Sequence, residues 1–137
     1  MWLFSRALGR YVRYSGSIGA DIRVLEPGYC QATLRDRRRV RNHLHSIHAM
    51  ALANLGELVT GLALMNSLPD HTRGILTGYS IDYVKKARGR LLAGCRCDIP
   101  TDNAERTVEV DGEITDSTAA VVATIQARWL IGPEPAR

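Results

Sequence analysis

The sequence predicts an α+β protein in which one curved antiparallel sheet wraps around a long central helix, with a short helix at the N-terminus. Two observations lead to this prediction. Residues 47–67 form an apolar segment of helical length. On both sides of it, apolar and polar residues alternate with the two-residue period of strands. The length of 137 residues fits one domain, which we expect to span residues 1–137.

Residues 1–15 are expected to form a short amphipathic helix with Arg6, Arg10 and Arg13 opposite a broad apolar arc. The segment has no acidic residue, a pattern also found in transit peptides and in helices that lie on membrane surfaces. We expect it to dock on the domain, because the chain continues into strand signals without a linker. The arc comprises Leu3, Phe4, Ala7, Leu8, Tyr11, Val12 and Tyr14.

Residues 20–26 and 29–35 are predicted to form a β-hairpin. Pro27 and Gly28 separate the two runs and occupy the positions that a type II turn prefers. Residues 37–45 are too charged and irregular to assign to a helix or a strand.

The central helix, expected over residues 47–67, is apolar on nearly every side, which indicates a buried helix. Pro69 and Asp70 follow it and would end it. One small sheet covers one side of such a helix. The remaining side therefore needs a second chain or the N-terminal helix.

The C-terminal half is predicted to consist of four strands. Apolar residues alternate in residues 74–86, 91–99, 108–114 and 119–131. The connections between these runs are short, which favours an antiparallel meander.

Glu57 is the only formally charged residue between His48 and Leu68. A carboxylate in a buried helix is costly unless it is paired, and its raised pKa would suit a general base. Asn54 and Gly61 lie three residues before and four residues after Glu57, so the three share a small polar face. A purely structural alternative is that Glu57 points to solvent or pairs with an arginine.

Asn42, His43, His45 and His48 crowd the segment that leads into this helix. Unpaired backbone N–H groups at a helix N-terminus can stabilise a developing oxyanion. The three histidines are spaced by two and three residues, so they do not share one helical face. We therefore expect no metal site.

The net charge is +4, and the basic residues are unevenly placed, with two clusters along the chain. Such clusters suit a phosphate-bearing partner, either nucleic acid or a small molecule such as coenzyme A, although each could also be a solvated face. One cluster comprises Arg35, Arg37, Arg38, Arg39 and Arg41; the other comprises Lys85, Lys86, Arg88 and Arg90.

Several function classes are excluded by missing patterns. No segment is long and uncharged enough to span a membrane, and no P-loop, nucleophile elbow or dinucleotide-binding glycine motif occurs. The arginine cluster lacks the interleaved aromatic residues of single-strand nucleic-acid binders. The odd number of cysteines, three, indicates free thiols, which are typical of a reducing compartment. We therefore expect a cytoplasmic location.

The spacing of four features resembles the hotdog-fold acyl-CoA thioesterases, in particular the phenylacetyl-CoA thioesterase type. Pro27-Gly28 ends a strand, Asn42 follows, His48 comes six residues later, and the acidic Glu57 stands nine residues after that histidine. His48-Ala49-Met50 stands where that family has His-Gly-Gly. The stretch 83–87, Tyr-Val-Lys-Lys-Ala, resembles the family's Tyr-x-x-Pro-Ala strand end. The resemblance covers about residues 16–131.

This resemblance implies a homodimer, or a homotetramer built from two dimers, with active sites at the dimer interface. It implies that the backbone N–H of Ala49 polarises the thioester carbonyl, and that Glu57 of the second chain acts as a base on water or as the nucleophile. Asn42 and His48 would shape the loop, and no cofactor or metal would be needed. Substrate contacts would come from Asn54 and Gly61 and, for the coenzyme A phosphates, from Lys85, Lys86, Arg88 and Arg90.

The first functional hypothesis is therefore hydrolysis of an acyl-CoA. The second is a non-catalytic acyl-CoA or lipid-binding protein on the same fold, which would not need Glu57. A third, nucleic-acid binding through the arginine cluster, has less support, and we expect neither nucleic acid nor a membrane span among the partners.

Overall fold

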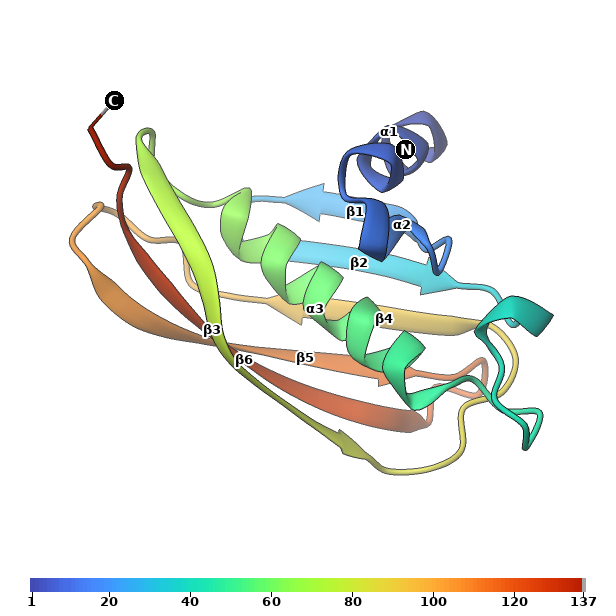
Figure 1. Ribbon diagram of the computed structural model, residues 1–137. Helices are drawn as coiled ribbons and strands as arrows, with labels where there is room; N and C mark the ends of the chain where they lie inside the picture. The colour runs from blue at the N-terminus through green and yellow to red at the C-terminus, as the bar shows by residue number, and fades with distance from the viewer. Residues whose placement is uncertain (137) are drawn as a thin grey trace.

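The computed structural model describes residues 1–136, except for the side chain of Tyr11. A six-stranded sheet of order β1-β2-β4-β5-β6-β3 curves around the central helix α3 (Ala49–Met65), and every pair of neighbours is antiparallel (Figure 1). The predicted fold class is confirmed. The strands are β1 (Asp21–Glu26), β2 (Tyr29–Leu34), β3 (Thr72–Tyr83), β4 (Leu91–Arg96), β5 (Arg106–Thr115) and β6 (Val121–Pro133).

The first two strands form the predicted hairpin. Glu26 pairs with Tyr29, so only Pro27 and Gly28 make the turn, and Gly28 has the positive φ of 75° that glycine adopts without strain. The unassigned segment that follows contains one short 3₁₀ helix, η1 (Arg38–Val40), before the chain enters α3.

Helix α3 is buried along most of its surface, as its apolar composition predicts. It begins at Ala49, two residues after the predicted start. The least covered side of the helix contains Ala53 and Glu57, which are four residues apart and half-buried. Met50 and Met65, at the two ends of this side, are exposed. The buried residues are Ala51, Leu52, Asn54, Leu55, Gly56, Leu58, Val59, Thr60, Gly61, Ala63 and Leu64.

The meander prediction holds for β4, β5 and β6 but is wrong for β3. Strand β3 pairs with β6, at the far edge of the sheet from β1, and not with β4. The connecting residues 84–90 instead run past the N-terminal end of α3 (Figure 1), where the Ile47 N–H donates to the Ala87 carbonyl at 2.8 Å. Alternation fixes which residues face the helix, but it does not fix which strands are neighbours.

A β-bulge within β3 changes which side chains point towards the core. The register with β6 shifts between Leu76 and Gly78, so Leu76 and Tyr79 both pack against the core although they are three residues apart. An unbroken alternation would put Ile75 on the same face of the strand as Tyr79. Ile75 is instead 47% exposed.

The N-terminal segment folds as two helices, α1 (Trp2–Tyr11) and α2 (Arg13–Gly16), which lie beside the β1 edge of the sheet (Figure 1). The docking does not use the whole apolar arc: Leu3, Phe4, Val12 and Tyr14 are exposed, and the side chain of Tyr11 lies outside the described residues. Contact with the sheet includes Ser5, whose Oγ accepts a hydrogen bond from Ile22 N at 2.8 Å. The edge strand β1 thereby gains an acceptor for one of its backbone N–H groups.

The close approach of α3 to the sheet depends on Gly56. A Cβ atom there would lie 2.5 Å from Cγ1 of the buried Ile125 and 2.5 Å from the Tyr79 hydroxyl. We predict that Gly56→Ala lowers the free energy of unfolding by about 1–3 kcal/mol through overpacking, even though alanine favours the helix by up to about 1 kcal/mol. Urea denaturation measures the change.

Gly94→Ala is the matched control, because nothing lies within 4 Å of the Cβ position at Gly94 in β4. This variant should keep wild-type stability. A Gly56→Ala protein as stable as the wild type would contradict the packing described here.

Candidate active site

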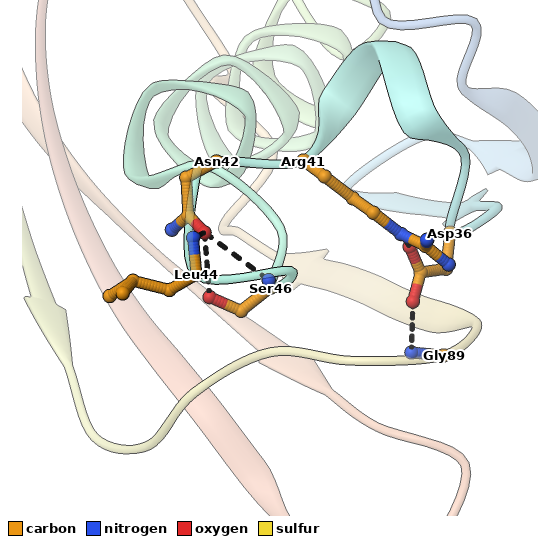
Figure 2. Close-up of polar contacts among 6 residues, drawn as sticks. All are labelled: Asp36, Arg41, Asn42, Leu44, Ser46 and Gly89. Atoms are coloured by element: carbon orange, nitrogen blue, oxygen red, sulfur yellow. Dashed lines mark hydrogen bonds and ion pairs between the residues drawn. The ribbon is translucent and has the colours of Figure 1, made fainter.

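Asn42 organises the loop that leads into α3. Its Oδ1 accepts hydrogen bonds from Leu44 N at 2.9 Å, from Ser46 N at 3.2 Å and from Ser46 Oγ at 3.2 Å (Figure 2). An asparagine side chain that accepts bonds from the backbone two and four residues later holds a turn in place. Within this structure the side-chain oxygen of Asn42 therefore shapes the loop.

Asp36 ties the same region to the segment between β3 and β4. It accepts hydrogen bonds from Arg41 Nε at 2.6 Å and from Gly89 N at 2.8 Å (Figure 2). The bond from Arg41 is the main reason that the pKa of Asp36 is lower than its usual value. Together with the bond between Ile47 and Ala87, these contacts fix residues 84–90 beside the start of α3.

His48 caps α3 and leaves one backbone donor unused. Its Nδ1 accepts from Met50 N at 3.0 Å, so the proton of the neutral ring is on Nε2. The N–H groups of Ala51 and Leu52 both donate to the His48 carbonyl. Among residues 1–136 the Ala49 N–H has no acceptor, which makes it available to a ligand oxygen at the positive end of the helix dipole.

Glu57 is half-buried in α3, and its carboxylate makes no ion pair or hydrogen bond within residues 1–136. Burial raises the pKa of Glu57 above its ordinary value. The structural alternative of pairing with an arginine is not realised in the described chain. A partly desolvated carboxylate without a counter-ion can accept a proton from a reacting group.

The surroundings of Glu57 come from α3, β3 and β6. A Cβ atom on Gly61 would lie 3.8 Å from Oε1 of Glu57 and 3.1 Å from Cζ2 of Trp129, so glycine leaves room for both side chains. The Trp129 indole N–H is buried and has no partner among the described residues. Tyr79 donates from its hydroxyl to the Ala53 carbonyl at 2.7 Å, and both burial and the nearby Glu57 charge raise the pKa of Tyr79.

Asn54 contacts a different part of the molecule from Glu57 and Gly61, with which the helical spacing grouped it. Its Nδ2 donates to the Tyr14 carbonyl of α2 at 3.3 Å. Asn54 also lines a cavity of about 370 Å³ beside the start of α3, together with His48, Ala51, Arg39 and Arg41. The structure thus brings Asn54 together with His48 and brings Gly61 together with Glu57.

The second basic cluster lies on residues 84–90, beside the loop that Asn42 organises. Lys85 already has a partner, because its Nζ lies 2.8 Å from Oδ2 of Asp116. Hydrogen bonds from Lys85 and Thr118 lower the pKa of Asp116. The remaining members, Lys86, Arg88 and Arg90, are exposed.

No group of side chains within residues 1–136 has the composition and proximity of a metal site, and His43 and His45 are exposed. In the same range, no helix is both long enough and apolar enough to cross a membrane.

Three aromatic residues of the site were not predicted from the sequence: Tyr79, Tyr83 and Trp129. Tyr79 and Tyr83 have the four-residue spacing that puts both on one face of β3, and their hydroxyls donate to the carbonyls of Ala53 and Ala49, one helical turn apart. The sequence showed that the two tyrosines share a face of the strand. It did not show that they lie over the side of α3 that carries Ala49 and Ala53.

The architecture is that of the hotdog-fold thioesterases. A structural-genomics target, APC5556, superposes with a TM-score of 0.86 at 28% identity, covering 95% of this chain and 88% of its own. A probable thioesterase from Pseudomonas aeruginosa gives 0.81 at 22% identity, covering 95% and 91%. A thioesterase from Haemophilus influenzae gives 0.80 at 12% identity, also covering 95% and 91%.

Residues 1–131 match DUF4442, a domain of unknown function, and the chain belongs to that family. No curated protein matches the chain in sequence. The family and the structural neighbours support the resemblance to hotdog-fold thioesterases, and they leave the substrate and the roles of individual residues to be proposed from the site itself.

The raised pKa of Glu57 predicts a dependence of stability on pH. Above the pKa that Glu57 has in the folded protein, its carboxylate is charged in both the folded and the unfolded state, and its burial opposes folding. Well below the ordinary pKa of a glutamate, the carboxyl group is neutral in both states. Glu57→Gln is neutral at every pH. We predict that Glu57→Gln melts above the wild type at pH 8, and that this difference in melting temperature shrinks towards pH 4.

Glu109→Gln serves as the control for this measurement, because it removes an exposed carboxylate from β5. Its melting temperature should differ from that of the wild type by the same small amount across the range. If the Glu57→Gln difference were constant with pH, the burial of the Glu57 charge would not have the effect described.

Proposed function

We propose that this protein is a thioesterase that hydrolyses an acyl-coenzyme A, with Glu57 as its catalytic carboxylate. The observation on which the proposal rests is the half-buried Glu57 without a counter-ion, on a helix whose first N–H is also without a partner. Hydrolysis of a thioester requires a donor for the developing oxyanion and a base for water, and these two groups are of the required kinds.

In the proposed reaction the thioester carbonyl oxygen accepts a hydrogen bond from Ala49 N–H. The Glu57 carboxylate takes a proton from water as the water oxygen attacks the carbonyl carbon. The tetrahedral oxyanion remains bonded to the Ala49 N–H. Its collapse breaks the carbon–sulfur bond, releases the carboxylic acid and returns the proton from Glu57 to the departing coenzyme A sulfur.

These two groups cannot meet at one carbonyl within a single chain. Eight residues separate Ala49 from Glu57, which is about 12 Å along a helix that rises 1.5 Å per residue. Oε1 of Glu57 lies beside Gly61, 3.8 Å from its Cβ position and so a further turn away from Ala49. In this conformation it does not reach a water molecule held against the same carbon. We therefore propose a homodimer in which each site combines Ala49 of one chain with Glu57 of the other.

Two exposed features support such a dimer. The open side of α3 carries Glu57 between the exposed methionines Met50 and Met65, and a second chain could cover this apolar strip. Strand β3, 12 residues long, forms one edge of the sheet, so its outer backbone groups can pair with the same strand of a second copy.

A second candidate is a non-catalytic acyl-CoA-binding protein on the same fold. It is favoured by the residues at the start of α3, where Ala49 and the 57% exposed Met50 occupy positions that are glycines in the thioesterase motif. Their side chains narrow the approach to the Ala49 N–H. This candidate predicts that acyl-CoA binds and is not hydrolysed.

The test is a screen of acyl-CoA substrates of different chain length and aromaticity with the wild type and Glu57→Gln. The wild type should release free coenzyme A from at least one substrate. Glu57→Gln should lower kcat by about 10²–10⁴-fold, because loss of a general base has effects of that size. Glu109→Gln should leave kcat unchanged. Undiminished turnover by folded Glu57→Gln would refute the role of Glu57, and binding without turnover by the wild type would favour the second candidate.

A further inference from the structure

The N-terminal helices enclose a second cavity, which differs from the one at the start of α3. It has a volume of about 640 Å³ and lies between α1, α2, β1 and residues 37–39. Arginines from two distant parts of the chain line it: Arg6 and Arg10 from α1, and Arg37 and Arg39 from the segment before α3. The sequence showed these as separate basic runs, and the fold brings them together.

The charges in this cavity are not balanced by the protein. The four guanidinium groups form no ion pair within residues 1–136, and Asp21 is the only carboxylate in the cavity wall. Like charges around one cavity repel each other unless an anion lies between them. Guanidinium groups bind phosphate through paired N–H donors, and several of them suit a ligand with more than one negative charge.

The two cavities adjoin at Arg39. This residue donates from Nη2 to the Ser17 carbonyl at 2.7 Å, and its side chain lines both the arginine cavity and the cavity that contains His48 and Asn54. A ligand with phosphates among the arginines can therefore extend along Arg39 towards the start of α3, where the unpaired Ala49 N–H lies.

We propose that the arginine cavity binds the phosphate-bearing part of the thioester substrate, the nucleotide half of coenzyme A. This inference rests on the proposed function, and it assigns the phosphates to a different place from the cluster at Lys85–Arg90. Lys85 is held by Asp116, and Lys86, Arg88 and Arg90 line neither the arginine cavity nor the cavity beside the start of α3. Trp2 lines the arginine cavity and is 61% exposed. The Arg6 guanidinium lies over one face of its ring, 4.8 Å from the centroid, and the other face offers a flat surface for the adenine ring.

The experiment measures binding, so it does not require turnover. Isothermal titration calorimetry at low salt gives the Kd of the full-length protein for coenzyme A, for adenosine 3′,5′-bisphosphate and for pantetheine, which lacks phosphate. The test variant is Arg6→Gln/Arg10→Gln/Arg37→Gln. The control variant is Lys86→Gln/Arg88→Gln/Arg90→Gln, which removes the same charge from residues that do not line the arginine cavity.

The test variant should bind coenzyme A and the bisphosphate at least tenfold more weakly than the wild type, while the control changes either Kd less than twofold. Binding to the wild type should weaken as salt is added. Pantetheine binding should be the same in all three proteins. If the triple variant is unfolded by circular dichroism, Arg6→Gln/Arg10→Gln, confined to exposed positions of α1, replaces it.

Unchanged binding of the bisphosphate by the folded test variant would overturn the proposal, as would a larger loss in the control. Binding to phosphatidylglycerol vesicles without binding to the bisphosphate would also overturn it, since the anion would then be a lipid headgroup. Failure of the proposed function has a different signature: the wild type would bind coenzyme A through the arginines and hydrolyse none of its esters.

Discussion

A buried helix must find a partner for each of its polar groups, and in α3 most of these groups have one. Met50 N is capped by His48, the N–H groups of Ala51 and Leu52 share the His48 carbonyl, and Thr60 Oγ1 donates to the carbonyl of Gly56. The Ala49 N–H and the Glu57 carboxylate are among the groups that have no partner in the described chain. These two groups are the ones that the proposed mechanism uses, one as the donor to the oxyanion and the other as the base.

The rest of the architecture keeps these two groups in position. Gly56 and Gly61 let α3 approach the sheet closely enough for Tyr79 to reach the helix backbone and for Trp129 to lie beside Glu57. Asn42 and Asp36 hold the loop before α3 and the segment after β3 in a fixed relation. The helix start is therefore set by side chains that lie outside the helix.

The sequence predicted those features that depend on local patterns. The apolar composition of residues 47–67 predicted a buried helix, the alternation predicted strands, and the isolation of Glu57 drew attention to it. Features that depend on contacts between distant segments were missed or wrong. Alternation could not show that β3 pairs with β6, and it could not place the bulge near Thr77. Nor could helical spacing show that Asn54 contacts Tyr14 while Glu57 and Gly61 face Trp129. The arginine cavity combines two such distant segments.

The central claim is that each site takes its N–H donor from one chain and its carboxylate from the other. Ala49→Pro removes the N–H with little disturbance, because proline is favoured at the first position of a helix and His48, with φ of −61° and ψ of 138°, has a conformation allowed before proline. Ala49→Pro and Glu57→Gln should each be inactive alone.

The decisive measurement is the hydrolysis rate of dimers refolded from an equal mixture of these two variants. In a mixed dimer, one of the two sites combines the intact N–H of one chain with the intact carboxylate of the other. Half of the randomly formed dimers are mixed, so the mixture should recover about a quarter of wild-type activity. No recovery from folded, mixed dimers would show that the two groups do not act together across the interface.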